Sequence, residues 1–175
     1  MTTGELLAVQ LDGTRDWTKK LMADLSGDDW SFQPAPGLPH ATWLCGHMTV
    51  SQHLLIHVRC LGGDGPLDET FVSCFPTGKP VVPVGGPVKS VAEQDYPPLE
   101  LLLETMDDTH AKTLAVVREM SDELLAEPAF GADGKLSHPH YRDKLGAVTH
   151  CARHEAFHTG QLATLRRLLG KSFLR

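Results

Sequence analysis

The sequence predicts an all-α protein, a bundle of four helices, and three observations lead to this prediction. Four long stretches lack proline and repeat apolar residues at intervals of three, four and seven, as one face of a helix requires. No stretch shows the convincing apolar-polar alternation of a strand. The length of 175 residues suits one well-packed domain, so we expect a single domain over residues 1–175.

The first predicted helix covers residues 4–25. Its apolar stripe consists of Leu7, Leu11, Thr14, Trp17, Leu21 and Leu25. Arg15 and its charged neighbours lie largely off this stripe. A Ser-Gly-Asp-Asp turn ends the helix, and the proline-rich stretch 30–39 that follows cannot be helical. We expect Trp30 and Phe32 in this stretch to fold back over one end of the core.

The second predicted helix covers residues 40–61 and includes a histidine in its apolar stripe. That stripe consists of Trp43, His47, Val50, Leu54 and Val58. At 100° per residue, His53 and His57 are rotated from His47 by roughly 120° and 80°. We therefore expect His47 to face the core, and His53 and His57 to lie at the surface or the rim.

The connection between the second and third helices, residues 62–96, is rich in glycine and proline. A connection of this length is unusual and often functional, so we expect a lid or a binding loop. Its glycines match no phosphate-binding pattern, and nucleotide binding is not supported. The connection can span the length of a bundle, so an up-down-down-up order of the helices is as feasible as a simple up-and-down order.

The third predicted helix covers residues 99–120 and starts after two prolines, which can begin a helix but cannot continue one. Ser121 is placed to cap an extra turn after this helix. In the loop 128–142, we expect His138 and His140 to reach the mouth of a pocket.

The fourth predicted helix covers residues 143–169 and carries a row of histidines. His150, His154 and His158 follow one another at four-residue spacing with an offset of about 40°, so they share one face. Two imidazoles at i and i+4 on a helix are close enough to bind one metal ion. Cys151 is a further candidate ligand, although it is more typical of a small core residue. The alternative is that these are core histidines which only hydrogen-bond to backbone carbonyls.

The His-x-x-x-His spacing occurs more often than chance predicts. With 10 histidines in 175 residues, random placement gives roughly half of one such pair. The chain has the pairs His53/His57, His150/His154 and His154/His158. A metal site also needs a ligand from elsewhere, since sites in helical bundles combine inward-facing residues of different helices. The second helix offers His47 for this purpose.

Composition and charge argue against several kinds of partner. The formal net charge of −6 at pH 7 lacks the basic excess that nucleic-acid binding requires. The N-terminus shows no signal-peptide pattern and no run approaches the roughly 18 apolar residues of a membrane span, so we expect a cytoplasmic protein without a membrane partner. The four cysteines are scattered, and no disulfide framework is expected without a secretion signal.

Two segments of the chain carry a specific resemblance. The segments His40-Ala-Thr-Trp-Leu-Cys-Gly-His47 and His154-Glu-Ala-Phe-His158-Thr-Gly-Gln161-Leu-Ala-Thr-Leu-Arg-Arg-Leu-Leu-Gly170 resemble the DinB/YfiT-like metalloenzyme superfamily. The resemblance covers most of the chain in helix order and is weakest at residues 62–96. It implies an up-down-down-up four-helix bundle that holds one divalent metal ion. The implied ligands are His47, His154 and His158, and zinc and nickel are the expected metals.

The same resemblance implies a function. Similar proteins include transferases that use low-molecular-weight thiols such as bacillithiol or mycothiol, and homodimers are common among them. We therefore expect a metal-dependent transferase that acts on small molecules with a thiol as co-substrate and works as a homodimer. A metal-dependent hydrolase and a non-catalytic metal- or ligand-binding bundle are the alternatives.

Three further residues are candidates for supporting the metal ligands. His150 extends the ligand row by one turn, either as a fourth ligand or as a residue that orients one. Glu155 is rotated by roughly 100° from His154, so its carboxylate is expected to orient a ligand imidazole or to be a solvated or interhelical charge. Gln161 lies one turn beyond His158, where it is expected to hydrogen-bond a ligand or cap a neighbouring helix.

Overall fold

The structure, a computed structural model, describes residues 1–75, 88–130 and 140–174. These residues form helices and no strand, apart from two isolated bridges, which confirms the predicted all-α class. Within them, no helix has the length and apolar character that crossing a bilayer requires. The helices in chain order are α1 (Thr3–Met22), the 3-10 turn η1 (Gly27–Trp30), α2 (Ala41–Gln52), the π-helical η2 (His53–Val58), α3 (Glu69–Cys74), α4 (Leu99–Arg118), α5 (Asp122–Ala126) and α6 (Lys144–Leu168).

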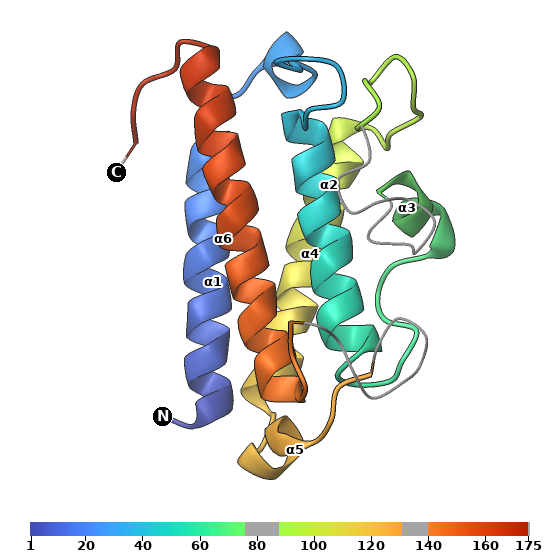
Figure 1. Ribbon diagram of the computed structural model, residues 1–175, viewed down its shortest axis with the longest axis vertical. Coiled ribbons are helices and arrows are strands. Elements are labelled where there is room, and N and C mark those ends of the chain that lie inside the picture. The colour runs from blue at the N-terminus through green and yellow to red at the C-terminus, as the bar shows by residue number, and fades with distance from the viewer. Residues whose placement is uncertain (76–87, 131–139, 175) are drawn as a thin grey trace.

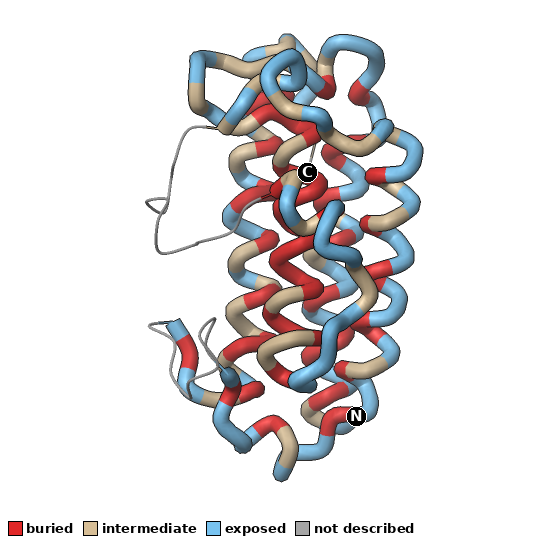
Figure 2. The backbone as a smooth tube through the Cα atoms, turned by 90° about the vertical axis from the view of Figure 1, so that its right-hand side faces the viewer, coloured by how far each residue is buried: buried red, intermediate tan, exposed pale blue. Residues whose placement is uncertain are grey.

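The long helices α1, α2, α4 and α6 lie side by side (Figure 1). Both α1 and α2 pack against α4 and against α6. In the view of Figure 1, α1 and α6 run upward, whereas α2 and α4 run downward. Buried positions follow the inner faces of these helices along their length (Figure 2). The core is therefore a column enclosed by the four long helices, and α2 and α6 are neighbours in it.

Local capping explains where the two helices with candidate metal ligands begin. The Asp143 carboxylate accepts a hydrogen bond from the backbone N–H of Gly146 and so caps α6. At the start of α2, Nδ1 of His40 accepts from the backbone N–H of Trp43. The predicted helix 143–169 consequently matches α6 closely, and the predicted second helix begins where α2 does.

The prediction for His53 and His57 is wrong, because both side chains are buried. They lie in η2, where backbone bonds span five residues, as between the N–H of Arg59 and the carbonyl of Leu54 at 3.0 Å. A π turn advances by less than 100° per residue, so a pattern read at α-helical spacing misplaces His57. His53 is the first residue of the turn and keeps its α-helical direction from His47, so its burial comes from the loop that follows. This loop covers both side chains. Gly65 has a φ of +70°, and a Cβ there would lie 2.5 Å from the His53 ring.

The connection 62–96 contains the short helix α3, and residues 76–87 of the predicted lid lie outside the described part of the chain. Phe75 follows α3 and packs, fully buried, onto α2 at Gly46. A Cβ at Gly46 would lie 2.1 Å from the Phe75 ring, so only glycine allows this approach. The connection thus packs against α2 at the residue before His47.

Trp30 and Phe32 cover one end of the core, as predicted. Trp30 is buried and Phe32 is partly buried, and both belong to the cluster of apolar side chains that includes Leu21, Met48 and Leu165. The indole N–H of Trp30 donates to the carbonyl of Leu25, so this polar group is paired within the core.

Candidate metal centre

Three histidines from neighbouring helices meet between α2 and α6. His47 lies on α2, and His154 and His158 lie one turn apart on α6. Nε2 of His154 lies 3.3 Å from Nε2 of His47 and 3.2 Å from Nε2 of His158. One ring nitrogen from each residue falls within 4.8 Å of the others, so the group could hold a metal ion. The structure thus brings together the three residues that the sequence predicts as ligands.

The separations between these nitrogens fit a divalent metal ion. Imidazole nitrogens bind zinc at about 2.0–2.1 Å, so two of them at the corners of a tetrahedron lie about 3.3 Å apart. The separations of His154 Nε2 from His47 Nε2 and from His158 Nε2, 3.3 and 3.2 Å, are close to that edge. Nitrogens that converge in this way present their lone pairs to one point, which is what a metal ion requires.

Gln161 fixes the protonation pattern of His158. Its Oε1 lies 2.7 Å from Nδ1 of His158. A carbonyl oxygen can only accept a hydrogen bond, so Nδ1 carries the proton and donates it. The lone pair of the neutral ring then lies on Nε2, the nitrogen that faces His154. This is the usual arrangement around a metal-bound histidine, whose second ring nitrogen donates to a protein oxygen.

The site keeps its imidazoles neutral. Burial, followed by the neighbouring imidazoles, lowers the pKa of His47 to about 2 and the pKa of His154 to about 3. Burial also lowers the pKa of His158, although its hydrogen bond with Gln161 acts in the opposite direction. Metal binding requires unprotonated imidazoles, so all three groups are in the binding form at neutral pH.

Aromatic side chains flank the three histidines. The Trp43 indole is stacked on the His47 ring with centroids 4.3 Å apart and planes inclined by 10°. Phe157 meets the His158 ring edge to face, at 5.2 Å between centroids, while 65% of its surface is exposed. From the sequence, Trp43 was expected in the apolar stripe of its helix, with no role at the metal site assigned to it. Its four-residue distance from His47 on the same helix is the signal that places one ring over the other.

The ring of His47 contains a buried nitrogen without a partner. Its Nδ1 makes no hydrogen bond to any described residue. Buried polar atoms without partners are rare and costly, so their presence needs an explanation other than folding stability. Nδ1 of His53, outside the three-histidine group, is in the same state, so the unpaired Nδ1 of His47 departs from the usual arrangement of a metal-bound histidine and does not mark the site.

The other predicted supporting residues lie differently. The ring of His150 stacks on that of His140 at 5.3 Å and lies 5.9 Å from His154 between centroids, outside the three-histidine group. The Glu155 carboxylate bonds to the guanidinium of Arg15 on α1, so it is the interhelical charge rather than a partner of a ligand imidazole.

Cys151 and His138 add no described ligand to the group. Cys151 is buried, and burial raises the pKa of its thiol, which opposes the thiolate form that a metal would need. His138, which we expected to reach the mouth of a pocket, lies outside the described residues. His140 is exposed and packs on His150.

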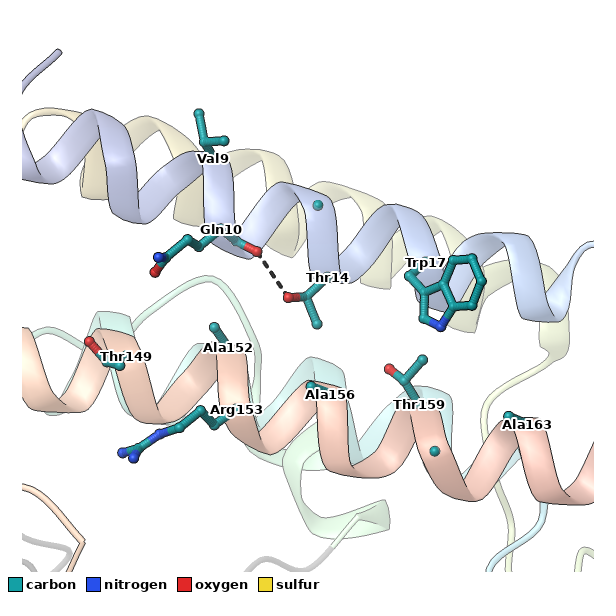
Figure 3. A pocket seen from close by; sticks show the side chains of 12 residues that line it. Val9, Gln10, Thr14, Trp17, Thr149, Ala152, Arg153, Ala156, Thr159 and Ala163 are labelled. Carbon is teal, nitrogen blue, oxygen red and sulfur yellow. Dashed lines mark hydrogen bonds between the residues drawn. The ribbon is translucent and has the colours of Figure 1, made fainter. Parts of the chain in front are cut away.

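A groove lies elsewhere on α6. It has a volume of about 760 Å³ and runs between α1 and α6 (Figure 3). Small side chains line it, among them Ala152, Ala156 and Ala163, and Trp17 lies at one end. Ala156 is rotated by about 200° from His154, so the groove lies on the side of α6 away from the histidines. We therefore base no chemistry on this groove.

Comparisons with known proteins bear on the fold and the family. No curated protein matches the chain. A crystal structure of a conserved protein from Enterococcus faecalis has the same fold, with a TM-score of 0.71 and 18% sequence identity over 98% of this chain and 99% of that chain. The sequence profile of the DinB superfamily matches residues 10–162, a range that contains all three histidines. The protein is therefore a member of the DinB superfamily.

Proposed function

We propose that the protein is a divalent-metal-dependent transferase that joins a low-molecular-weight thiol to a small electrophile. Its scaffold is a single-domain, up-down-down-up four-helix bundle. The observation that carries the proposal is the convergence of His47, His154 and His158 through Nε2 atoms 3.2 and 3.3 Å apart. Three protein ligands leave a coordination position open, as in catalytic rather than structural sites.

The protein's own residues prepare this site for a thiol. A divalent metal such as zinc or nickel supplies positive charge that favours the thiolate form of a bound thiol. Gln161 holds His158 in the tautomer that presents Nε2, and Trp43 holds the ring of His47. The thiol loses its proton to solvent, its sulfur forms a bond to the electrophilic carbon, and the leaving group departs with the bonding electron pair.

The position of Glu155 favours a thiol over water as the nucleophile. Water is far less acidic than a thiol, so hydrolysis gains from a general base close to the attacking oxygen. Glu155 follows His154 in the chain, but both of its carboxylate oxygens accept hydrogen bonds from Arg15, at 2.7 and 3.0 Å. This carboxylate is therefore not directed at the metal ligands, and hydrolysis remains the second candidate.

We further propose that the protein is a cytoplasmic homodimer. The groove between α1 and α6 supports a partner surface, since the exposed side chain of Val9 and several small residues give it an apolar lining. Sedimentation velocity at micromolar concentration tests this assignment. A single species of twice the chain mass is expected, and a monomer would contradict it.

The transferase proposal is tested with a panel of low-molecular-weight thiols and small electrophiles. We expect conjugate formation by zinc- or nickel-loaded protein and its loss after chelation. The His57→Ala variant is the matched control, because it removes a buried histidine outside the site. Failure of every thiol and electrophile pair to give metal-dependent conjugate would refute thiol transfer, and metal-dependent ester or amide cleavage would support hydrolysis instead.

A further inference from the structure

A buried arginine lies at the centre of the helix packing. Arg15 on α1 is 1% exposed, although its position in the sequence lies off the apolar stripe of that helix. Its Nε and Nη2 donate to the two carboxylate oxygens of Glu155 on α6, at 2.7 and 3.0 Å. Nη1 donates to the carbonyl of Met106 on α4 at 3.0 Å, and Nη2 donates to Oε1 of Gln52 on α2 at 3.4 Å. One guanidinium therefore bonds to all three other long helices.

The same contacts connect the two helices that carry the candidate metal ligands. Gln52 belongs to α2, which carries His47, and Glu155 is adjacent to His154 on α6. Arg15 thus bridges α2 and α6 through two residues, Gln52 and Glu155, that lie near the histidines in the sequence. This places one guanidinium where it can set the distance between the two ligand-bearing helices.

Two threonines complete the network on the same side of α6. Thr18 on α1 donates to Oε1 of Glu155 at 3.0 Å, and its hydroxyl lies 2.8 Å from that of Thr159. Thr159 follows His158 directly in the chain. Each histidine of the α6 pair is therefore followed by a residue that is bonded to α1.

The apolar pattern of α6 does not by itself define which face turns inward. Among its exposed residues are Leu145, Phe157 and Leu168, whereas Glu155 and Thr159 are buried. A helix usually takes its rotation from an apolar stripe, and here that signal is weak. Hydrogen bonds and ion pairs that form at only one rotation of α6 can fix that rotation where the apolar stripe does not.

The candidate site tolerates little rotation of α6. An imidazole nitrogen at roughly 7 Å from the helix axis moves by about 0.6 Å when the helix turns by about 5°. Metal-ligand distances are held to within about 0.2 Å. The rotation of α6 must therefore be fixed more tightly than soft apolar packing requires.

We propose that Arg15 and Glu155 are positioning residues that fix the rotation of α6 against α2, and so hold His154 and His158 within reach of His47. This inference rests on the proposed metal site. A buried ion pair is weak evidence for stability, since well-packed apolar residues often replace such pairs without loss. The value of this pair therefore lies in the single arrangement of helices that it specifies.

The test replaces the whole pair, because removal of one partner would leave an unpaired buried charge. The variant Arg15→Met/Glu155→Leu is compared with Lys19→Met/Asp107→Leu. The control pair joins α1 to α4 with Nζ and Oδ2 2.9 Å apart, but it lies in solvent. Both proteins are titrated with Co²⁺, whose visible absorption spectrum reports the geometry of its ligands, and their melting temperatures are recorded without metal.

We expect the buried-pair variant to melt at or above the wild-type temperature, to bind Co²⁺ about 10-fold or more weakly, and to give an altered cobalt spectrum. The exposed-pair variant should match wild type in affinity and spectrum. Wild-type affinity and spectrum in a folded buried-pair variant would overturn the proposal. If that variant does not fold, Arg15→Lys keeps the charge and removes the two-point contact, and it must show the same loss.

A second readout needs no metal. Nitrogen-15 chemical shifts of the histidine rings in metal-free protein should change for His154 and His158 in the buried-pair variant and stay unchanged in the control. If wild-type protein binds no Co²⁺, the proposed function fails, but this shift difference still tests the positioning of the rings. Unchanged ring shifts in the buried-pair variant would overturn the positioning role.

Discussion

Two His-x-x-x-His pairs in this protein have the same spacing and different surroundings. His53 and His57 lie in η2, where Nε2 of His57 bonds to the Thr113 hydroxyl at 3.0 Å. His154 and His158 lie in α6 and face a third imidazole across the helix interface. Spacing alone is therefore a poor guide to a metal site. The deciding feature is a further ligand from a neighbouring helix.

Burial and charge do not separate the two pairs either. Burial lowers the pKa of His53 to about 4 and also lowers the pKa of His57, as it does for the pair on α6. Both pairs are thus neutral at neutral pH. What separates them is a third imidazole, because nitrogens of His154 and His158 lie within 4.8 Å of each other and of a nitrogen of His47.

Removing one histidine from each pair tests most directly whether the two pairs differ in metal binding. We expect His154→Ala to weaken zinc binding by more than about 100-fold, since loss of a ligand should cost more than loss of a residue that supports one. His57→Ala should leave zinc affinity unchanged. Competition titrations against a chromophoric chelator measure both, and equal losses in the two variants would contradict the assignment of the site to α2 and α6.

Loss of the hydrogen bond from His158 to Gln161 should reduce zinc affinity less than loss of a ligand does. The Gln161→Leu variant keeps the size of the side chain but removes the oxygen that accepts from Nδ1. Zinc affinity should fall by about 10- to 100-fold, because the tautomer and the orientation of His158 are no longer fixed. The same chelator competition applies, and an unchanged affinity would show that Gln161 does not support the ligand.

Gly46 precedes His47 of the candidate site and Gly65 lies against His53, so substitutions at these two glycines compare the surroundings of the two sets of histidines. Added methyl groups at Gly46 and Gly65 would meet the rings of Phe75 and His53, at 2.1 and 2.5 Å. We expect Gly46→Ala and Gly65→Ala each to lower the free energy of unfolding by about 1–3 kcal/mol, as overpacking does. Only Gly46→Ala should also weaken zinc binding, because Gly46 precedes His47. Urea unfolding and chelator competition together check this, and a zinc defect in Gly65→Ala would contradict it.

The pH dependence of stability is shared by both pairs and does not distinguish them. Buried histidines stay neutral in the folded state while those of the unfolded chain take up protons below about pH 6.5. Stability of the metal-free protein should therefore fall as pH falls from 6.5 toward 4, by about 1 kcal/mol per pH unit for each such histidine. His154→Ala and His53→Ala should each flatten the slope. Urea unfolding at several pH values measures it, and an unchanged slope would show that these groups are not buried neutral.

Much of the fold was predictable because it depends on local patterns. Proline-free stretches with apolar residues at helical spacing gave the long helices, and capping at Asp143 marks the start of α6. His47 was also predictable because it lies in the apolar stripe of its helix, and His154 and His158 were predictable because their four-residue spacing puts them on one face. To predict that they meet, it was enough to assume that α2 and α6 are neighbours.

The rest depends on features that helical spacing does not encode. The π turn of η2 changes the direction of His57, and the loop at Gly65 covers His53; no residue type marks either feature in advance. Arg15 reads as a solvent charge when α1 is considered alone, and for Glu155 the sequence left a partner of a ligand imidazole, a solvated charge and an interhelical charge open. They are buried because each finds the other across the interface between α1 and α6, which is a property of the tertiary packing.

Metal content tests whether His47, His154 and His158 form one metal site. Untagged protein is purified without chelator and analysed by plasma mass spectrometry, beside a His47→Ala variant prepared in the same way. We predict about one equivalent of zinc or nickel per chain in wild type, and far less in the variant. No metal in wild type after incubation with zinc and nickel, or equal content in both proteins, would contradict the account.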